Sequence, residues 1–323
     1  MTDDAPDGGV AAEPPALADA VDAVEAEYDC TVLAARDVGS RAWDLDDAGS
    51  DYDVAVLFRQ PLLRYATLGE YVPTVETELD DVELTGWNVR RFAELLADSN
   101  PTTLEFLHSP RRYRAFDPLA ALEADVGGQF EPIRLYHHYR SLAERQYRKY
   151  LERRLLAAGE PAFVVVDETA DHWVCVPSDG GTGLGRQLAG AELRTISKDD
   201  DRYELGRCDR TVRRTLYVVR AVLYARYVRD THSFPTLSFP TFLDECEAAG
   251  RVDPSVLDRV RTLVRRKRAG EGDAVVGSTF SGEELALPSD VSPEAHAVRG
   301  IDTDRVNEFV EAAFENGSSP VAR

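Results

Sequence analysis

Two aspartates at the start of an apolar run are the residues best placed to do chemistry. Asp51 and Asp53 alternate with other residues across 51–58, so this run reads as a strand with both carboxylates on one face. Their backbones would lie roughly 6.6 Å apart, twice the strand rise. Carboxylates so placed can share two Mg²⁺ ions about 3.5–4 Å apart, the arrangement used for phosphoryl or nucleotidyl transfer. We therefore interpret Asp51 and Asp53 as metal ligands, with Mn²⁺ as an alternative ion.

A Gly-Ser pair supplies the second half of such a site. Gly39 and Ser40 follow the apolar run 30–38, which we expect to be a strand. Glycine lets the backbone approach a phosphate closely, and a helix start after it would aim N–H donors there. The spacing Asp-x-Asp alone is typical of a solvated surface in so acidic a chain, and it recurs at Asp44 and Asp46. The combination with Gly39-Ser40 favours a site for metal and phosphate.

A third carboxylate comes from the alternating run 81–87. Glu83 lies in the middle of this expected strand, where glutamate is disfavoured unless its face is exposed or functional. An exposed edge strand explains Glu83 when it is considered alone. Beside the aspartate pair, Glu83 is the natural third metal ligand.

The stretch 208–229 predicts a helix with a polar column. Arg213, Tyr217, Arg220 and Tyr224 recur at i, i+4, i+7 and i+11 and share one side. Guanidinium and phenol groups are suited to clamping phosphate and stacking on a base. A solvated basic face on a core helix explains the same periodicity, and both interpretations stay open here.

The remaining elements follow from periodicity and from capping residues. Asn88 and Asn100 are expected N-caps of helices over 89–97 and 101–107. Residues 61–75 are expected to be loop with some helix, and the glycine-rich 180–185, which lacks a Walker lysine, is expected to be a flexible insertion whose loop continues to 201. Further strands are predicted at 113–116, 163–166 and 172–176, and further helices at 16–28, 118–124, 132–158, 239–248, 254–268 and 302–314.

Composition indicates an unusual solvent. The 323 residues include 58 Asp and Glu against 37 Lys and Arg, a net charge of −21, and only Lys149, Lys198 and Lys267 are lysines. Excess carboxylate with so little lysine indicates an extreme halophile, and we expect a haloarchaeal source. In molar salt the Debye length falls to about 3 Å, so the net charge does not exclude a nucleic-acid partner.

Cysteine spacing and hydropathy bear on the compartment. The four cysteines are widely separated, without a CxxC pair or a histidine at metal spacing, so isolated thiols in a reducing environment are expected. The sequence contains no run of 18 apolar residues, and its first residues are acidic. We expect a cytoplasmic protein without a membrane span.

The order of several motifs resembles one family. The chain resembles the predicted nucleotidyltransferases of the YcgL-like family, an RNA-repair-associated branch of the DNA polymerase β superfamily, over roughly 30–270. One departure is Asp44, where the family usually has glycine after the tryptophan. The matching motifs are GSRAW at 39–43, SDYD at 50–53, GWNVR at 86–90, SNP at 99–101, LEFL at 104–107, YHHY at 136–139, YRKYL at 147–151 and RRTLYVVR at 213–220.

The resemblance implies an α+β fold, in which a polymerase β-like nucleotidyltransferase domain with a small mixed sheet precedes an α-helical domain. Asp51 and Asp53 would lie on one strand of that sheet and Glu83 on its neighbour. We expect a disordered acidic N-terminus at 1–15 and the nucleotidyltransferase domain at 16–128. A helical domain at 129–270 would carry a hairpin and loop insertion at about 160–205, before an acidic segment and helix at 271–323.

Two functions remain open at this point. The first is a Mg²⁺-dependent nucleotidyltransferase that moves a nucleoside monophosphate from a nucleoside triphosphate to a hydroxyl; an RNA 3′ end, a protein and a small molecule all fit as the acceptor. Asp51, Asp53 and Glu83 would bind the ions, and Glu83 would help to deprotonate the hydroxyl. The second is a non-catalytic nucleotide- or RNA-binding module, acting as a sensor or as an antitoxin-like partner. The residues expected to hold phosphate or base are Gly39, Ser40, Arg41, Arg213, Tyr217 and Arg220.

Overall fold

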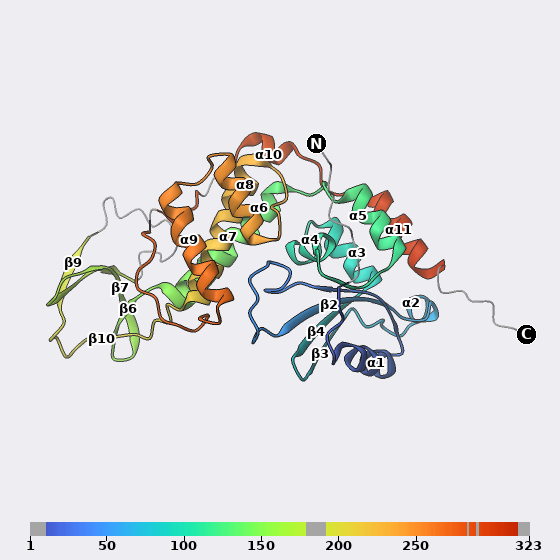
Figure 1. Ribbon diagram of the computed structural model, residues 1–323, viewed down its shortest axis with the longest axis horizontal. Coiled ribbons are helices and arrows are strands. Elements are labelled where there is room, and N and C mark those ends of the chain that lie inside the picture. The colour runs from blue at the N-terminus through green and yellow to red at the C-terminus, as the bar shows by residue number, and fades with distance from the viewer. Residues whose placement is uncertain (1–10, 179–191, 283, 289–290, 316–323) are drawn as a thin grey trace, which may run out of the picture. The chain divides into compact units, whose positions relative to one another are not determined.

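The computed structural model describes residues 11–178, 192–282, 284–288 and 291–315. The chain forms two compact units, drawn in Figure 1. Unit 1 combines Met1–Leu135, Ser233–Phe242 and Pro293–Arg323, and unit 2 combines Tyr136–His232 and Leu243–Ser292. None of the helices in the described ranges has both the length and the apolar character that crossing a bilayer requires.

Unit 1 contains a five-stranded mixed sheet in the order β3-β4-β2-β1-β5. Strands β2 and β4 run parallel, and every other neighbouring pair is antiparallel. The small mixed sheet and its helices confirm the expected α+β class for this part of the chain. The strands are β1 (Thr31–Asp37), β2 (Tyr52–Arg59), β3 (Thr74–Leu79), β4 (Val82–Asn88) and β5 (Arg112–Arg114).

Helices surround this sheet, and two of them begin as the sequence predicts. The side chain of Asn88 accepts a hydrogen bond from the Arg90 N–H, and that of Asn100 accepts one from Thr102, so both predicted N-caps are confirmed. The helices of unit 1 are α1 (Leu17–Tyr28), α2 (Leu63–Ala66), α3 (Val89–Ala97), α4 (Pro101–His108), α5 (Asp117–Val126), α10 (Pro293–Ala297), α11 (Thr303–Glu315) and the start of α8 (Phe239–Ala248).

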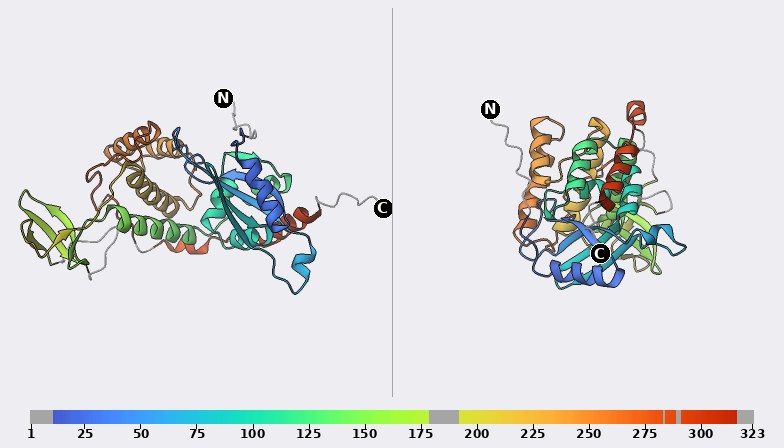
Figure 2. Two further views of the ribbon diagram at one scale, coloured as in Figure 1. Left: turned by 90° about the horizontal axis from the view of Figure 1, so that it is seen from below. Right: turned by 90° about the vertical axis from the view of Figure 1, so that its right-hand side faces the viewer.

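The two faces of the sheet are covered differently. Helix α1 lies along one face, as Figure 2 shows, where Leu17 and Val21 belong to one cluster with Val54 and Val56 of β2. Because side chains alternate along a strand, Asp53 and its i+2 neighbours point to the opposite face. On α3, Phe92 lies 6.0 Å, centroid to centroid, from Phe309 of the C-terminal helix α11.

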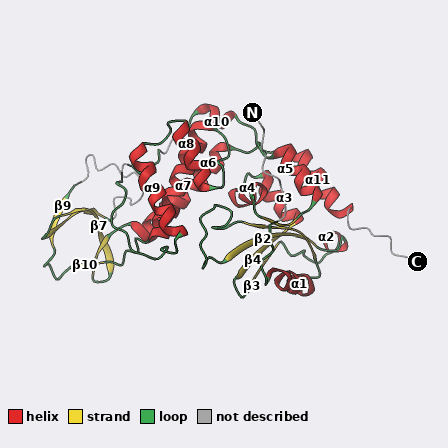
Figure 3. Cartoon of the chain, in the orientation of Figure 1, coloured by secondary structure: helices red, strands yellow, loops and turns green. Residues whose placement is uncertain are grey.

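Unit 2 joins helices to a second sheet, and Figure 3 shows its strands gathered at one end of the unit. The strand order is β10-β6-β7-β8-β9, with every neighbouring pair antiparallel. Its elements are α6 (Pro132–Gln146), the π-helical turn η1 (Tyr147–Leu151), β6 (Arg154–Ala157), β7 (Glu160–Glu168), β8 (His172–Pro177), β9 (Arg194–Ser197), β10 (Glu204–Leu205), α7 (Val212–Thr231), the rest of α8, and α9 (Pro254–Arg268).

The single long helix predicted over 132–158 is wrong beyond residue 146. The chain passes through η1 and then enters β6, which pairs with β7. Ala158 and Gly159 between these strands have φ angles of 50° and 83°, the left-handed pair that a tight hairpin turn requires. Apolar residues of 135–151 keep helical spacing, so periodicity alone did not show where the helix ends.

Three other expectations need correction. The loop predicted over 61–75 ends inside β3. The loop predicted to continue to 201 contains β9. Because β9 pairs with β8, the hairpin predicted over 163–176 is part of a five-stranded sheet. Both strands are short, and their polar residues hid them. The glycine-rich 180–185 lies outside the described residues, as does most of the expected disordered terminus; Ala11, which is described, donates its N–H to the Arg112 carbonyl at 2.7 Å.

Candidate functional site

The register of β2 and β4 brings two predicted carboxylates side by side. Asp53 of β2 is directly opposite Glu83 of β4, and the two strands are parallel. Paired residues of neighbouring strands project to the same face of the sheet, so both carboxylates lie on the face opposite α1. Asp51 precedes Asp53 by two residues and shares its direction. The three predicted ligands therefore gather where β2 and β4 begin.

Like charges accumulate at this place. Burial raises the pKa of Asp53, and the charge of Asp51 raises it further. The pKa of Glu83 is raised chiefly by Asp53, with burial, Asp51 and Glu78 adding to the effect. Carboxylates that raise one another's pKa lack sufficient positive charge nearby, and this is the setting in which a bound cation stabilises the charged forms.

The Gly-Ser turn is attached to one of these carboxylates. The Val38 N–H donates to the Asp53 carbonyl at 2.8 Å, and the Ser40 N–H donates to the Asp53 carboxylate, which lowers its pKa. A Cβ atom on Gly39 would lie 1.7 Å from Oδ2 of Asp53. Only glycine fits here, because any larger residue at position 39 would push the turn away from the Asp53 carboxylate.

Asp37 holds the same turn from the other side. Its Oδ1 accepts the N–H of Gly39 at 3.0 Å and that of Ala42 at 3.2 Å, and its Oδ2 accepts the Tyr113 hydroxyl at 3.1 Å. The side chain is fully buried, and burial raises its pKa to about 6. The sequence analysis missed Asp37, although a carboxylate two residues before a glycine is typical of a side-chain-capped turn.

Arg41 closes the loop between the turn and β2. Its Nη2 donates to the Ser50 carbonyl at 2.7 Å, its Nη1 pairs with Asp46 at 3.2 Å, and its guanidinium lies 3.7 Å from the Tyr52 ring centroid. The buried Nε has no hydrogen-bond partner among the described residues. The side chain is therefore held in place with one donor unused, and its charge lowers the pKa of Asp53.

The backbone conformation and side-chain partners of Asp44 account for an aspartate at this position. Its φ is 59°, in the left-handed region that glycine adopts without strain and aspartate tolerates. Its carboxylate accepts the Ser238 hydroxyl at 3.2 Å and pairs with Arg111 at 3.8 Å. Asp44 thus forms this turn with two side-chain partners.

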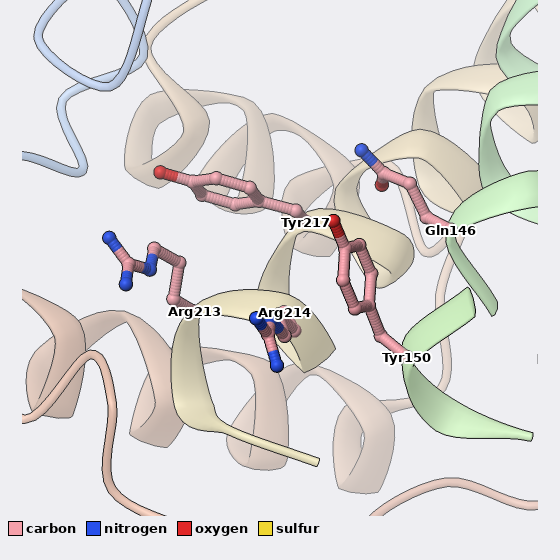
Figure 4. Close-up of a pocket in the computed structure, with 5 residues that line it drawn as sticks. All are labelled: Gln146, Tyr150, Arg213, Arg214 and Tyr217. Atoms are coloured by element: carbon pink, nitrogen blue, oxygen red, sulfur yellow. The ribbon is translucent and has the colours of Figure 1, made fainter. Parts of the chain in front are cut away.

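The predicted column on α7 does not form one continuous surface. Arg213 and Tyr217 line a pocket of unit 2 (Figure 4). Arg220 is 4% exposed, with its guanidinium 5.0 Å from the Tyr224 ring centroid. Tyr224 is itself fully buried against Tyr139. The first two residues can meet a ligand at this pocket, whereas the second two pack within α7 and its neighbours.

The described side chains are not already arranged as a metal coordination shell. In the described part of the chain, no three His, Cys, Asp or Glu side chains have the arrangement of a metal site. Asp51 and Glu83 are both exposed, so their rotamers can change without repacking the core. Their oxygen donors are the type that Mg²⁺ prefers, and their mutual repulsion fits a cation between them.

Comparison with known proteins identifies the family. The model of the RNA repair pathway DNA polymerase beta family matches residues 15–311. The chain belongs to this family. A relative within the curated proteins is the uncharacterized protein YcgL of Bacillus subtilis (strain 168), 23% identical over 257 residues that cover 79% of this chain and 76% of that protein. No solved structure matches significantly. Membership in this polymerase beta family confirms the resemblance drawn from the motifs.

Proposed function

We propose that the protein is a Mg²⁺-dependent nucleotidyltransferase that moves a nucleoside monophosphate from a nucleoside triphosphate to a hydroxyl acceptor. The observation that carries this proposal is the register of Asp53 beside Glu83, with Asp51 in front and the Gly39-Ser40 turn attached to Asp53. Membership in the RNA repair pathway DNA polymerase beta family supports the reaction class and favours RNA as the acceptor.

Asp51, Asp53 and Glu83 would hold the metal. Two Mg²⁺ ions, or Mn²⁺ in their place, would neutralise the triphosphate and lower the pKa of the acceptor hydroxyl. The donor set fits because each carboxylate of the pair Asp53 and Glu83 has a pKa raised by its neighbours. The negative charges of these carboxylates repel one another when no cation is present, and the same charges would attract the ions.

The transfer itself needs a base and a leaving group. The acceptor oxygen forms a bond to the α-phosphorus, the bond from that phosphorus to the bridging oxygen breaks, and pyrophosphate leaves with the electron pair. Glu83 would help to deprotonate the acceptor hydroxyl, either directly or by holding a metal that lowers the pKa of that hydroxyl.

The loop from Gly39 to Arg41 would hold the β- and γ-phosphates. Gly39 leaves the space that the Asp53 carboxylate occupies, and Ser40 would contribute its hydroxyl to a phosphate. Arg41 is fixed by Ser50 and Tyr52, and its charge would attract the phosphates to this loop. An arginine already held in place loses little conformational entropy when it binds phosphate.

The test is transfer of labelled nucleoside monophosphate to RNA in molar KCl with Mg²⁺. Glu83→Gln should abolish transfer and leave triphosphate binding largely intact. The matched control is Glu76→Gln, an exposed glutamate of β3 whose register partner is Thr85. Full activity in Glu83→Gln would refute the three-carboxylate site, and nucleotide or RNA binding without any turnover would favour the non-catalytic module instead.

A further inference from the structure

A pocket of about 250 Å³ in unit 2 has the composition of a nucleotide site. Figure 4 shows its five lining residues, which come from α7 and from the end of α6 with η1. None of the lining residues is a carboxylate. They are Gln146, Tyr150, Arg213, Arg214 and Tyr217.

The π-helical turn fixes one wall of this pocket. The Tyr150 carbonyl accepts the N–H of Asp209 at 3.1 Å, and the Leu151 carbonyl accepts Nε and Nη2 of Arg210 at 3.0 and 2.8 Å. These bonds hold a widened turn open and place the Tyr150 ring beneath Arg214, whose guanidinium lies 4.5 Å from the ring centroid. Turns of this kind occur frequently at functional sites.

Two arginines make the pocket an anion site. Arg213 and Arg214 belong to the first turn of α7, where the helix dipole adds positive potential. Arg213 pairs with Asp273, which is 81% exposed, and Arg214 pairs with Asp209 at 2.6 Å. The Arg213 pair is exposed and is worth about 0–1 kcal/mol, whereas the Arg214 pair is half-buried. A phosphate, which arginine binds through two parallel hydrogen bonds, can therefore displace Asp273 from Arg213.

The other lining residues indicate which kind of molecule carries the phosphate. The Tyr217 ring lines the pocket from α7, whereas the Tyr150 ring already lies against Arg214 and Lys149. The Gln146 amide offers its N–H donors to a base edge, since its Oε1 is buried. Among the described residues that line the pocket there is no carboxylate to hold the Mg²⁺ of a triphosphate, and the cavity of about 250 Å³ is small. These features indicate a nucleoside with one phosphate group.

We propose that this pocket binds the terminal, phosphate-bearing nucleotide of an RNA strand. The assignment rests on the proposed function, because it gives the family's RNA to unit 2 and the triphosphate to the carboxylates of unit 1. The phosphate lies between Arg213 and Arg214, and the base lies against Tyr217. Arg220, which does not line the pocket, has no part in this binding.

The test is fluorescence anisotropy with the full chain in molar KCl and short RNAs bearing a 5′-phosphate, a 3′-phosphate or only hydroxyl ends. One phosphorylated RNA should bind about ten-fold more tightly than the hydroxyl-ended RNA, as one added charge-assisted contact predicts. Arg214→Gln should remove this preference. The control Arg202→Gln changes an arginine of unit 2 that is 77% exposed and pairs with Asp200, and it should retain the preference.

Other outcomes separate the two proposals. Asp51→Asn should keep the phosphate preference while losing transfer, so failure of the nucleotidyltransferase leaves the pocket result standing. An unchanged preference in Arg214→Gln, with the variant shown to be folded by circular dichroism, would overturn the assignment. Equal binding of all three RNAs would overturn it too. Inorganic phosphate or a nucleoside monophosphate competing as strongly as the RNA end would assign the pocket to a free phosphate compound instead.

Discussion

Unit 1 and unit 2 each gather charged side chains at a candidate binding surface, but the charges are balanced in opposite ways. In unit 1, Asp51, Asp53 and Glu83 repel one another, and only Arg41 among the groups that shift the pKa of Asp53 brings positive charge. In unit 2, Arg213 and Arg214 each have a carboxylate partner. The first surface becomes more stable when a cation arrives, and the second can bind an anion only by exchanging partners.

This difference predicts at which of the two surfaces ligand binding changes the free energy more. A site of uncompensated carboxylates is unfavourable until it is filled, so its ligand changes the free energy strongly. The exposed pair of Arg213 with Asp273 loses little when it opens. Substitutions in unit 1 should therefore have large effects on chemistry, and substitutions in unit 2 should change affinity and selectivity by smaller factors.

The largest effect is expected for Asp53→Asn. Removing this charge takes away a ligand of the ions, and metal stabilisation of developing charge is worth several kcal/mol. We expect transfer to fall about a thousand-fold, since each ten-fold corresponds to about 1.36 kcal/mol. The measurement is the rate of label transfer under saturating Mg²⁺, with Glu76→Gln as the control. A rate within ten-fold of the wild type would contradict the proposed ligand role.

Asp37 should give unit 1 a pH-dependent stability. Its pKa is raised to about 6 in the folded chain, so the folded chain binds this proton more tightly than the unfolded chain does. Stability should fall as pH rises from about 4 to about 6 and then stay level, by about 3 kcal/mol. Asp37→Asn should lack this fall, so the difference between the two free energies of unfolding, measured in urea without divalent metal, should change across that interval. A constant difference would show that burial of this carboxylate is relieved in another way.

Gly39→Ala tests the attachment of the turn to Asp53. The new Cβ would lie 1.7 Å from Oδ2 of Asp53, so the turn or the carboxylate must move. We expect a loss of about 1–3 kcal/mol of stability, as for other overpacked sites, together with weaker triphosphate binding. Gly49→Ala in the same loop is the control, because its Cβ would meet no atom closer than 3.6 Å. Equal behaviour of the two variants in thermal unfolding and nucleotide titration would exclude the steric argument.

The smallest effect is expected for Asp273→Asn in unit 2. The exposed pair with Arg213 should contribute no more than about 1 kcal/mol, so the melting temperature should hardly change. Because the carboxylate competes with phosphate for Arg213, RNA with a terminal phosphate should bind more tightly to the variant. Anisotropy titrations at one salt concentration measure this. Weaker binding would mean that Asp273 holds Arg213 in its binding position and does not compete with phosphate for it.

The sequence was most informative where local rules act. Alternation located β2 and β4, and the capping residues Asn88 and Asn100 located the starts of α3 and α4. The expectation that Asp51 and Asp53 share a face depended only on period-two spacing, which is local. That Glu83 lies on the neighbouring strand was implied by the family resemblance, and the register of β2 and β4 agrees with it.

Features that depend on distant contacts could not be inferred in this way. Asp37 looks like the polar end of an apolar strand, and its role depends on Tyr113, which is distant in sequence. Gln146 and Tyr150 reach the pocket through a π-helical turn, which helical periodicity does not reveal. The packing of α11 against α3 likewise depends on Phe309 meeting Phe92 across most of the chain.

The most direct test is calorimetric titration of the wild type with a non-hydrolysable nucleoside triphosphate in molar KCl, with and without Mg²⁺. The wild type should bind the nucleotide only when Mg²⁺ is present, and Asp51→Asn and Asp53→Asn should each lose most of that binding, whereas Glu76→Gln should retain it. Binding that is equally strong without Mg²⁺, or unchanged in both aspartate variants, would contradict a cation site built by these carboxylates.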